Sequence, residues 1–177
     1  TYTGDVTLGD DDNAEIAATD ISTIAGDTTG DVTVTNDIII TGTSAAITTA
    51  VGNVDSFSGA AKASLGNAHT LAQLKAINNA VSGQLTLTDY DVDLSGSTAD
   101  VKAALDGTFA EAYTGDVTLG DAHTLAQLKA INNATSGTIT LDINNAALSG
   151  SSADLVDAFA GTFTSSYSGN ITVSYTH

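Results

Sequence analysis

The sequence predicts an α/β repeat solenoid, with a parallel β-sheet on one side and helices on the other. Residues 68–80, AHTLAQLKAINNA, return unchanged at 122–134, and the step from Ala68 to Ala122 sets a period of 54 positions. Residues 2–10 also return unchanged, at 113–121. Strand-like and helix-like patterns alternate along the chain, and this alternation calls for parallel strands joined by crossover connections. Repetition at a fixed length favours a stacked array over a closed sheet.

The composition limits the partners of this chain. Of its 177 residues 42% are apolar, which is enough to bury a core. The formal charge is −17, from 21 acidic residues and four lysines, so nucleic acid is a poor partner. The acids either keep a long array soluble or need salt or bound cations to offset their mutual repulsion. No apolar run approaches the roughly 20 residues that span a membrane.

The first elements follow from local periodicity. Val6 and Leu8 alternate with polar residues, the pattern of a half-buried strand. Residues 10–25 resemble a helix whose isoleucines share a face and whose first turn is acidic. Two further strands are expected at 30–35 and 37–42.

Two helix types alternate in the rest of the chain. One begins near Gly42, Gly96 and Gly150, where Ser97 and Ser151 fit the S-x-x-D capping pattern. The other is the duplicated peptide, for which Thr124 with Gln127, or Asp121, can cap the second copy. Gly107 and Gly161 lie where the first helix type would stop.

Strands separate the helices. Full strands are expected at 83–87 and 137–141, and short extended pieces at 92–94 and 146–148. The chain closes on a strand at 170–174. We therefore expect one repeat array over residues 1–177. It divides into a degenerate first period (1–41), two full periods (42–95 and 96–149) and a partial period (150–177).

Threonine occupies the outward position between two aliphatic residues in six predicted strands. Stacked about 4.8 Å apart, these side chains would form a ladder of hydroxyl and methyl groups on a flat face, as in ice-binding solenoids. Threonine is also simply a favourable residue for an exposed strand position. The six positions are Thr7, Thr33, Thr86, Thr118, Thr140 and Thr172.

Calcium is the one cofactor that the sequence suggests. Ca²⁺ prefers carboxylate and carbonyl oxygens on flexible loops. The spacing of the acids is not that of an EF-hand, and no G-G-x-G-x-D nonapeptide occurs. Residues 89–93 read D-x-D-x-D, whereas the later segment 142–146 does not. A calcium site at 89–93 would therefore belong to one repeat only. The candidate ligands are Asp10, Asp11, Asp12, Asp89, Asp91 and Asp93.

Catalytic motifs are missing from the sequence, so we expect no enzyme. It has no G-x-S-x-G, no P-loop and no repeat-independent His-Asp-Ser arrangement. His69 and His123 are equivalent residues at helix starts. Neither has a second ligand three or four positions on, so no local zinc motif exists.

The repeat D-A-H-T-L-A-Q-L-K-A-I-N-N-A, followed by L-S-G-S-S-A-D-L, resembles a known class of tandem repeats. These are the DAATLAQ and LSDTAANL repeats of very large secreted bacterial surface proteins, cyanobacterial or proteobacterial, that accompany hemolysin-type calcium-binding regions. The resemblance covers nearly the whole chain, most clearly residues 68–163. It implies an extracellular, S-layer-like, adhesive or filamentous role.

The sequence thus leads to two functional hypotheses. The first is a structural or adhesive segment that builds a stiff rod or lattice by stacking end to end with identical or adjacent units, because strand material without polar caps stands at both ends. The chain opens at Thr1 in the middle of a repeat unit, so we expect it to be cut from something longer. The alternative is a binding module for ice or a surface glycan, acting through the threonine ladder.

Overall fold

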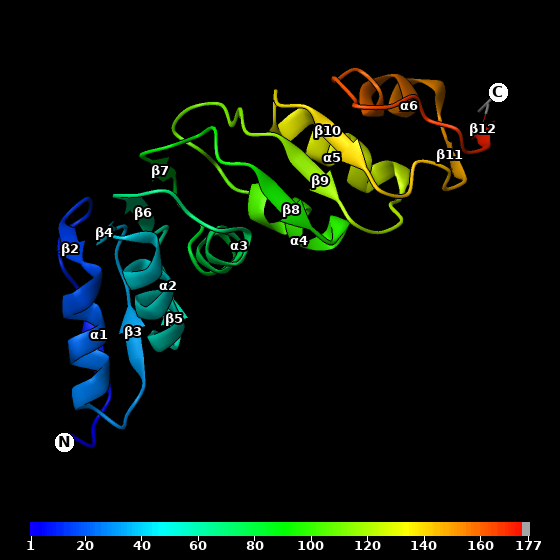
Figure 1. Cartoon of the computed structure of the whole chain (residues 1–177). Helices are drawn as coiled ribbons and strands as arrows, with labels where there is room; N and C mark the ends of the chain where they lie inside the picture. The colour runs from blue at the N-terminus through cyan, green and yellow to red at the C-terminus, as the bar shows by residue number, and fades with distance from the viewer. Residues whose placement is uncertain (175–177) are drawn as a thin grey trace. The chain divides into compact units, whose positions relative to one another are not determined.

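The computed structural model describes residues 1–174 and has an α/β architecture (Figure 1). Six helices and twelve short strands occur in the described residues. Every strand pair formed among them is parallel, as the alternation of strands and helices predicted. No helix in the described part of the chain is long and apolar enough to cross a membrane.

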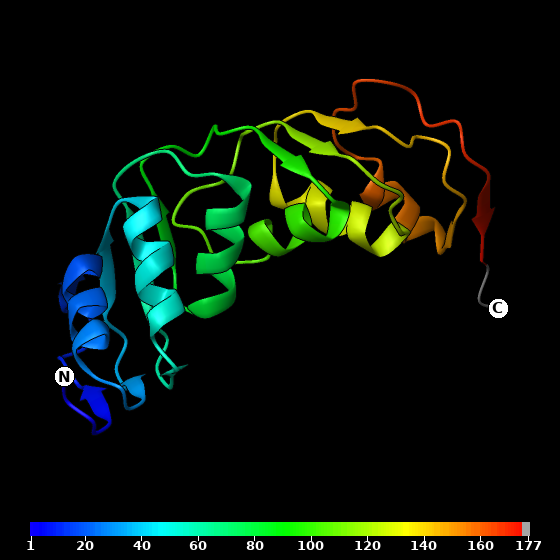
Figure 2. The same cartoon turned by 60° about the horizontal axis from the view of Figure 1, so that its bottom comes forward.

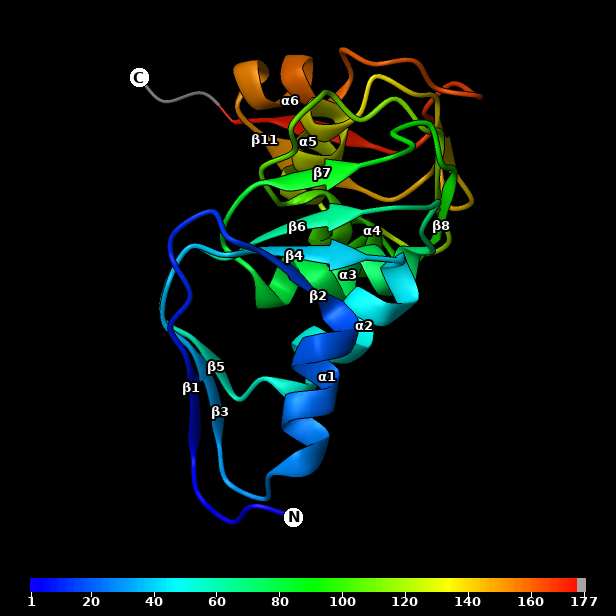
Figure 3. The same ribbon diagram turned by 90° about the vertical axis from the view of Figure 1, so that its left-hand side faces the viewer.

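The contacts divide the chain into two compact units, and the first comprises residues 1–89 with 107–111. It contains two parallel sheets, ordered β1-β3-β5 and β2-β4-β6-β7. Figure 3 shows these sheets as two sides of the unit and the helices as a third, and in Figure 2 the three helices stand in a row. The elements are β1 (Val6–Leu8), β2 (Glu15–Ala17), α1 (Ala18–Asp27), β3 (Val32–Val34), β4 (Ile39–Gly42), α2 (Ser44–Asn53), β5 (Ser56–Phe57), β6 (Lys62–Leu65), α3 (Leu71–Ala80) and β7 (Leu85–Leu87).

The second unit comprises residues 90–106 and the chain from 112 onward. Its sheets are ordered β10-β9-β8 and β11-β12. Helix α5 packs against both α4 and α6. The elements are β8 (Leu94–Gly96), α4 (Thr98–Leu105), β9 (Val117–Leu119), α5 (Leu125–Ala134), β10 (Ile139–Leu141), β11 (Leu148–Gly150), α6 (Ser152–Ala158) and β12 (Ile171–Val173).

The strand register shows how the chain returns to a neighbouring strand after each circuit. Val6 pairs with Val32 in the first sheet, and Ala63 pairs with Leu85 in the second. We call the stretch of chain from one residue to its partner in the next strand a coil. The separation along the sequence between Val6 and Val32, or between Ala63 and Leu85, is close to half the sequence period. Each of these two coils contains one helix, α1 in the first and α3 in the second.

Aliphatic residues from alternate strand positions and from one helix edge form the core. Val34 and Leu119 are fully buried on strands, and Leu128 and Ile131 of α5 are fully buried on the helix side. Burial of each such side chain stabilises the fold by about 1.5–3 kcal/mol. The equivalent edge of α3 is buried in the same way.

The local capping signals are confirmed. Ser97 Oγ accepts the N–H of Asp100 at 3.2 Å at the start of α4. Thr124 and Gln127 form a capping box at the start of α5. These hydrogen bonds satisfy N–H groups that the first turn of a helix leaves without a backbone acceptor.

The helix expected over residues 10–25 is wrong in its first half. Residues 10–14 form a loop in which Asn13 has φ 65°, and Ile16 lies in β2. Helix α1 begins only at Ala18, so the acids at 10–12 do not lie in its first turn. A left-handed residue interrupts a helix, while Ile16 finds a strand partner in Ile40.

Candidate functional site

The most regular polar feature is a side-chain contact between consecutive coils, which we call the Asx clamp. In the first unit Asn67 Oδ1 accepts the N–H and the hydroxyl of Ser44, at 2.8 and 3.2 Å. In the second unit Asp121 Oδ1 accepts the N–H and the hydroxyl of Thr98, at 2.7 and 2.6 Å. Both clamps join a residue just after a strand to the first residue of the helix in the coil before it.

The clamp at Asp121 is favoured by charge. The hydrogen bonds from Thr98 hold the pKa of the Asp121 carboxyl below its ordinary value of 3.8, against a smaller opposing effect of burial. An ionised acceptor makes a stronger hydrogen bond than a neutral amide. The second unit therefore carries the charged form of a contact that the first unit makes with an amide.

A second inter-coil contact comes from the motif X-[ST]-G-x-[VIL]-T-[VL], which occurs six times and contains all six ladder threonines. Where X is Thr or Tyr, its hydroxyl can donate to a backbone carbonyl of the preceding coil. We call the resulting set the hydroxyl column. It consists of Thr28 to Gly4 O at 2.6 Å, Tyr113 to Val92 O at 2.7 Å, Thr135 to Gly115 O at 2.9 Å and Tyr167 to Ala146 O at 2.5 Å.

The glycine of the same motif explains how the coils approach so closely. A Cβ at Gly30 would overlap the backbone of Gly4, and a Cβ at Gly115 would overlap the carbonyl of Val92. Gly83, Gly137 and Gly169 are equally crowded by the preceding coil. We call these positions the glycine column, and they need glycine because a neighbouring backbone occupies the side-chain space.

Several acids serve as acceptors between coils. Asp12 Oδ1 accepts the N–H of Asp37 at 3.1 Å, and Asp93 Oδ1 accepts the N–H of Asp116 at 3.1 Å. Asp91 Oδ1 accepts the hydroxyl of Thr114 at 3.2 Å. Three of the six candidate calcium ligands therefore have a structural use that the sequence did not reveal.

The remaining candidate calcium ligands lie on exposed loops. Asp10 and Asp11 follow β1, and the backbone carbonyl of Asp10 accepts the Asn36 amide at 2.6 Å. Asp89 follows β7, and its charge acts on His69. No group of three acidic or histidine side chains suited to a metal ion occurs in residues 1–174. Calcium binding stays a prediction.

The six ladder threonines lie in four different sheets. Thr7 pairs with Thr33, which pairs with Ser56. Thr86 pairs with Ser64, and Thr172 pairs with Ser149. In the second unit Ser95, Thr118 and Thr140 lie in register on neighbouring strands. The structure therefore contains short ladders of threonine and serine in place of one ladder of six threonines.

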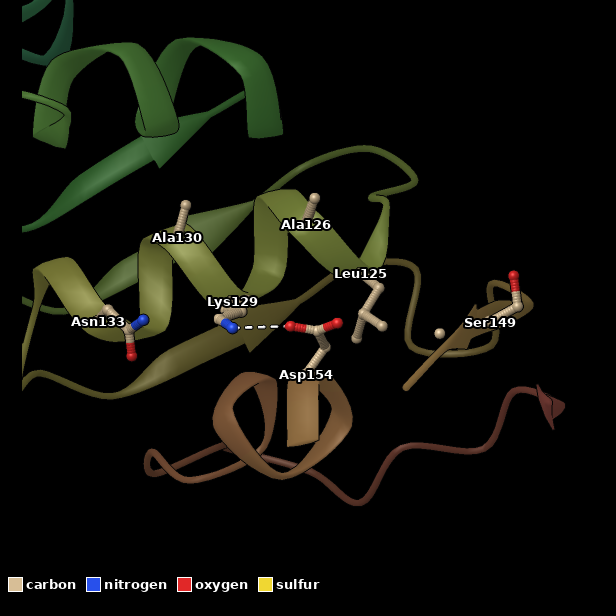
Figure 4. Close-up of a pocket in the computed structure, with 8 residues that line it drawn as sticks. Leu125, Ala126, Lys129, Ala130, Asn133, Ser149 and Asp154 are labelled. Atoms are coloured by element: carbon tan, nitrogen blue, oxygen red, sulfur yellow. Dashed lines mark hydrogen bonds and ion pairs between the residues drawn. The ribbon is translucent and has the colours of Figure 1, made fainter. Parts of the chain in front are cut away.

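A groove of 530 Å³ lies beside α5 and α6 in the second unit (Figure 4). Its floor is apolar, formed by alanines and a leucine of α5. Each lining residue has an identical counterpart one period earlier in the sequence, as Leu125 has in Leu71. The lining residues are Leu125, Ala126, Lys129, Ala130, Asn133, Ser149, Gly150 and Asp154.

The one cation of this groove is paired with two carboxylates. Lys129 Nζ lies 2.7 Å from Asp154 and 2.9 Å from Asp157. Hydrogen bonds from these two carboxylates raise the pKa of Lys129 to about 12. Lys129 therefore stays charged near neutral pH and links α5 to α6 rather than exchanging a proton.

His123 is buried, whereas the sequence indicated only a residue at a helix start. The residue is 5% exposed, and its ring makes a T-shaped contact with the ring of Tyr167, with centroids 5.8 Å apart. Neither ring nitrogen has a hydrogen-bond partner in the described residues. Burial lowers the pKa of His123. The backbone and the carboxylate of the nearby Asp121 raise this pKa, but by less than burial lowers it.

No family model matches the chain, and no curated protein or solved structure shows significant similarity to it.

Proposed function

We propose that this chain is a structural or adhesive segment of an extracellular surface protein, built as a stiff array of stacked coils. The observation that carries the proposal is that its recurring polar residues hold one coil to the next. The clamp of Asn67 with Ser44 recurs one full period later as the clamp of Asp121 with Thr98. Tyr113 and Tyr167 repeat the hydroxyl contact at the same interval.

The repeat explains this use of residues. A solenoid is stabilised mainly by contacts between neighbouring units, so selection on an array preserves the residues at those contacts. The proposed period consists of one helix like α3 or α5 and one like α4 or α6. The paired charge of Lys129 fits the same role, because it also joins neighbouring helices.

The surface location has support in composition and resemblance. A charge of −17 suits a saline medium, in which counter-ions screen repulsion between exposed carboxylates. The repeats resemble those of secreted bacterial surface proteins. Adhesive and S-layer-like roles both follow from an array of this kind displayed outside the cell.

Antibody labelling tests the location directly. Antibodies raised against the purified chain should label intact cells that produce the protein, with no need for permeabilisation. A cytoplasmic protein of the same cells serves as the control and should be labelled only in permeabilised cells. If the chain behaves like this control, the proposed surface role is wrong.

A second candidate function is a binding module that acts through threonine. This candidate is supported by the strand register, which places Ser95, Thr118 and Thr140 next to one another on the neighbouring strands β8, β9 and β10. Thermal hysteresis and glycan-array binding test it, using a variant with both Thr118→Tyr and Thr140→Tyr. Thr49→Tyr on α2 is the matched control. Parent protein without hysteresis or glycan binding would exclude this candidate.

A further inference from the structure

A buried histidine joins two neighbouring coils of the second unit through its ring. His123 lies just before α5 and is 5% exposed. Its ring makes a T-shaped contact with the ring of Tyr167, which follows α6 and belongs to the next coil. Tyr167 in turn makes a T-shaped contact with Phe159 and donates its hydroxyl to Ala146 O. We call the contact between His123 and Tyr167 the aromatic latch.

The His123 ring suits this place only while it is neutral. Neither Nδ1 nor Nε2 has a hydrogen-bond partner within residues 1–174. Protonation gives the ring a positive charge and an N–H donor at both nitrogens. A charge and two unpaired donors are unfavourable in a site from which water is excluded. The closed latch is therefore a contact of the neutral histidine.

The carboxylate of Asp121 compensates the charge of a protonated ring only in part. Asp121 stands two positions before His123, and its carboxylate favours the charged ring less than burial disfavours it. Its Oδ1 already accepts the N–H and the hydroxyl of Thr98. The acid nearest in the sequence is thus already engaged in the Asx clamp.

The other acids around this part of the second unit are placed elsewhere. The carboxylate of Asp142, which follows β10, lies beside Gly120, 3.8 Å from where a Cβ would stand. On α6, Asp154 and Asp157 form ion pairs with the lysine of α5. None of these carboxylates accepts a hydrogen bond from the His123 ring in the described chain.

From this arrangement we infer that mild acid releases the aromatic latch. Protonation of His123 favours a form in which Tyr167 has moved away and water reaches both ring nitrogens. The clamp between Asp121 and Thr98 stays closed, so the two coils that it joins remain attached. The release goes beyond the proposed structural role, because it makes one contact between coils depend on pH.

Two pKa values set the pH range of the release. Burial lowers the pKa of His123 from 6.5 while the latch is closed, and access of water removes this effect when the latch opens. The open form therefore binds a proton more readily, and its population rises as pH falls below 6.5, by up to about tenfold per pH unit. The hydrogen bonds from Thr98 hold the pKa of Asp121 below 3.8, so the clamp keeps its charge in mild acid.

Hydrogen exchange of two backbone amides tests the release. The Ser168 N–H, next to Tyr167 in the chain, donates to Asn144 O. The Ser136 N–H has the same position in the preceding copy of the motif and donates to Tyr113 O. The protection factor corrects for the intrinsic pH dependence of exchange. Between pH 7 and pH 5 it should fall at Ser168 by up to about tenfold per pH unit, and by clearly less at Ser136.

Two variants assign the pH dependence to one histidine. His123→Phe keeps a ring against Tyr167 but cannot bind a proton, so the Ser168 protection factor should no longer depend on pH. His69→Phe replaces the equivalent buried histidine one period earlier, and it is the matched control. This control should keep the pH dependence of the parent at Ser168.

Two further measurements separate the histidine from the carboxylate beside it. Asp121→Asn gives the clamp the amide acceptor that Asn67 provides in the first unit, and the pH dependence at Ser168 should persist. In the parent protein, an NMR titration of the His123 ring should give a midpoint below 6.5.

Four results would overturn the inference. They are a constant Ser168 protection factor in the parent, a pH dependence that survives in His123→Phe, loss of the dependence in Asp121→Asn, and a ring midpoint of His123 at or above 6.5. Equal losses at Ser168 and Ser136 would also overturn it, because they would show that the whole unit unfolds. These measurements do not depend on the location of the protein, which the antibody labelling tests separately.

Discussion

Asp121 and Thr98 are joined by two hydrogen bonds to one carboxylate oxygen, at 2.7 Å from the N–H and 2.6 Å from the hydroxyl. The pair links the end of β9 to the first turn of α4. Asn67 and Ser44 make the same contact one period earlier, with an amide in place of the carboxylate. A contact preserved through this chemical change indicates that this contact requires an oxygen acceptor in the right position rather than a negative charge.

Removing the neutral clamp should destabilise the first unit. Asn67→Ala leaves the Ser44 N–H without its acceptor at the start of α2, which costs about 1 kcal/mol in the free energy of unfolding. Urea denaturation measures this change. Asn53→Ala, at the exposed end of the same helix, is the control and should leave the midpoint nearly unchanged. Equal effects of the two substitutions would contradict a specific role for the clamp.

Filling the glycine column should destabilise the second unit. Gly115→Ala drives a Cβ into the carbonyl of Val92, and overpacking of this kind costs about 1–3 kcal/mol. The melting temperature should fall accordingly. At Gly120 a Cβ would lie 3.4 Å from Gly96 O, an ordinary contact, so Gly120→Ala is the matched control. A Gly115→Ala protein as stable as the control would show that the coils can separate at no cost.

Stability should fall in mild acid because of the buried histidine. Burial lowers the pKa of His123 from 6.5 in the folded state, so the unfolded chain binds a proton more readily below that pH. The free energy of unfolding should therefore decrease as pH drops below 6.5 and level off below the folded-state pKa. The lowered pKa of Asp121 adds a second loss as pH falls below 3.8. Urea midpoints across this range in the parent and in His123→Phe measure both.

His123→Phe should flatten the first part of this profile and leave the second part in place. His69, whose pKa is also lowered by burial, accounts for the slope that remains. An identical profile in the parent and the variant would contradict the assignment to His123.

Calcium, if it binds the folded chain, should raise the melting temperature. Millimolar Ca²⁺ should increase it by several degrees, because a ligand that binds only the folded state stabilises that state. A chelator should reverse the shift, and Mg²⁺ serves as the matched ion. Replacing Asp89 and Asp91 with Asn should reduce the shift, whereas an unchanged melt with calcium and with chelator would exclude the site.

Local features of this fold were predictable from sequence, since their causes lie within a few residues. The capping pair Thr124 and Gln127 and the cap at Ser97 each involve side chains three positions from their backbone partners. The parallel sheets followed from the alternation of strand and helix. The helix over 10–25 was wrong because amphipathic spacing around Ile16 fits both a helix and a strand preceding a helix.

The contacts between coils could not be predicted from local pattern. Tyr113 and Val92 are 21 residues apart, and nothing near either one indicates the other. The one available signal was the repeat itself, since Tyr113 and Tyr167 are followed by the same Ser/Thr-Gly pair. The serines that extend the threonine ladders, such as Ser95 and Ser64, were missed because the predicted ladder included only threonine at the outward strand position.

The spacing of the clamps by one full period has a consequence for the evolution of the gene. A segment of one full period begins and ends at the same kind of clamp. It can therefore be gained or lost as a unit, and each remaining Asn or Asp acceptor still has its Ser or Thr donor. Unequal recombination between the gene segments that encode the identical peptides of α3 and α5 would therefore change the length of the protein in units of one period. Natural variants should differ in period number while sharing the residues of each junction.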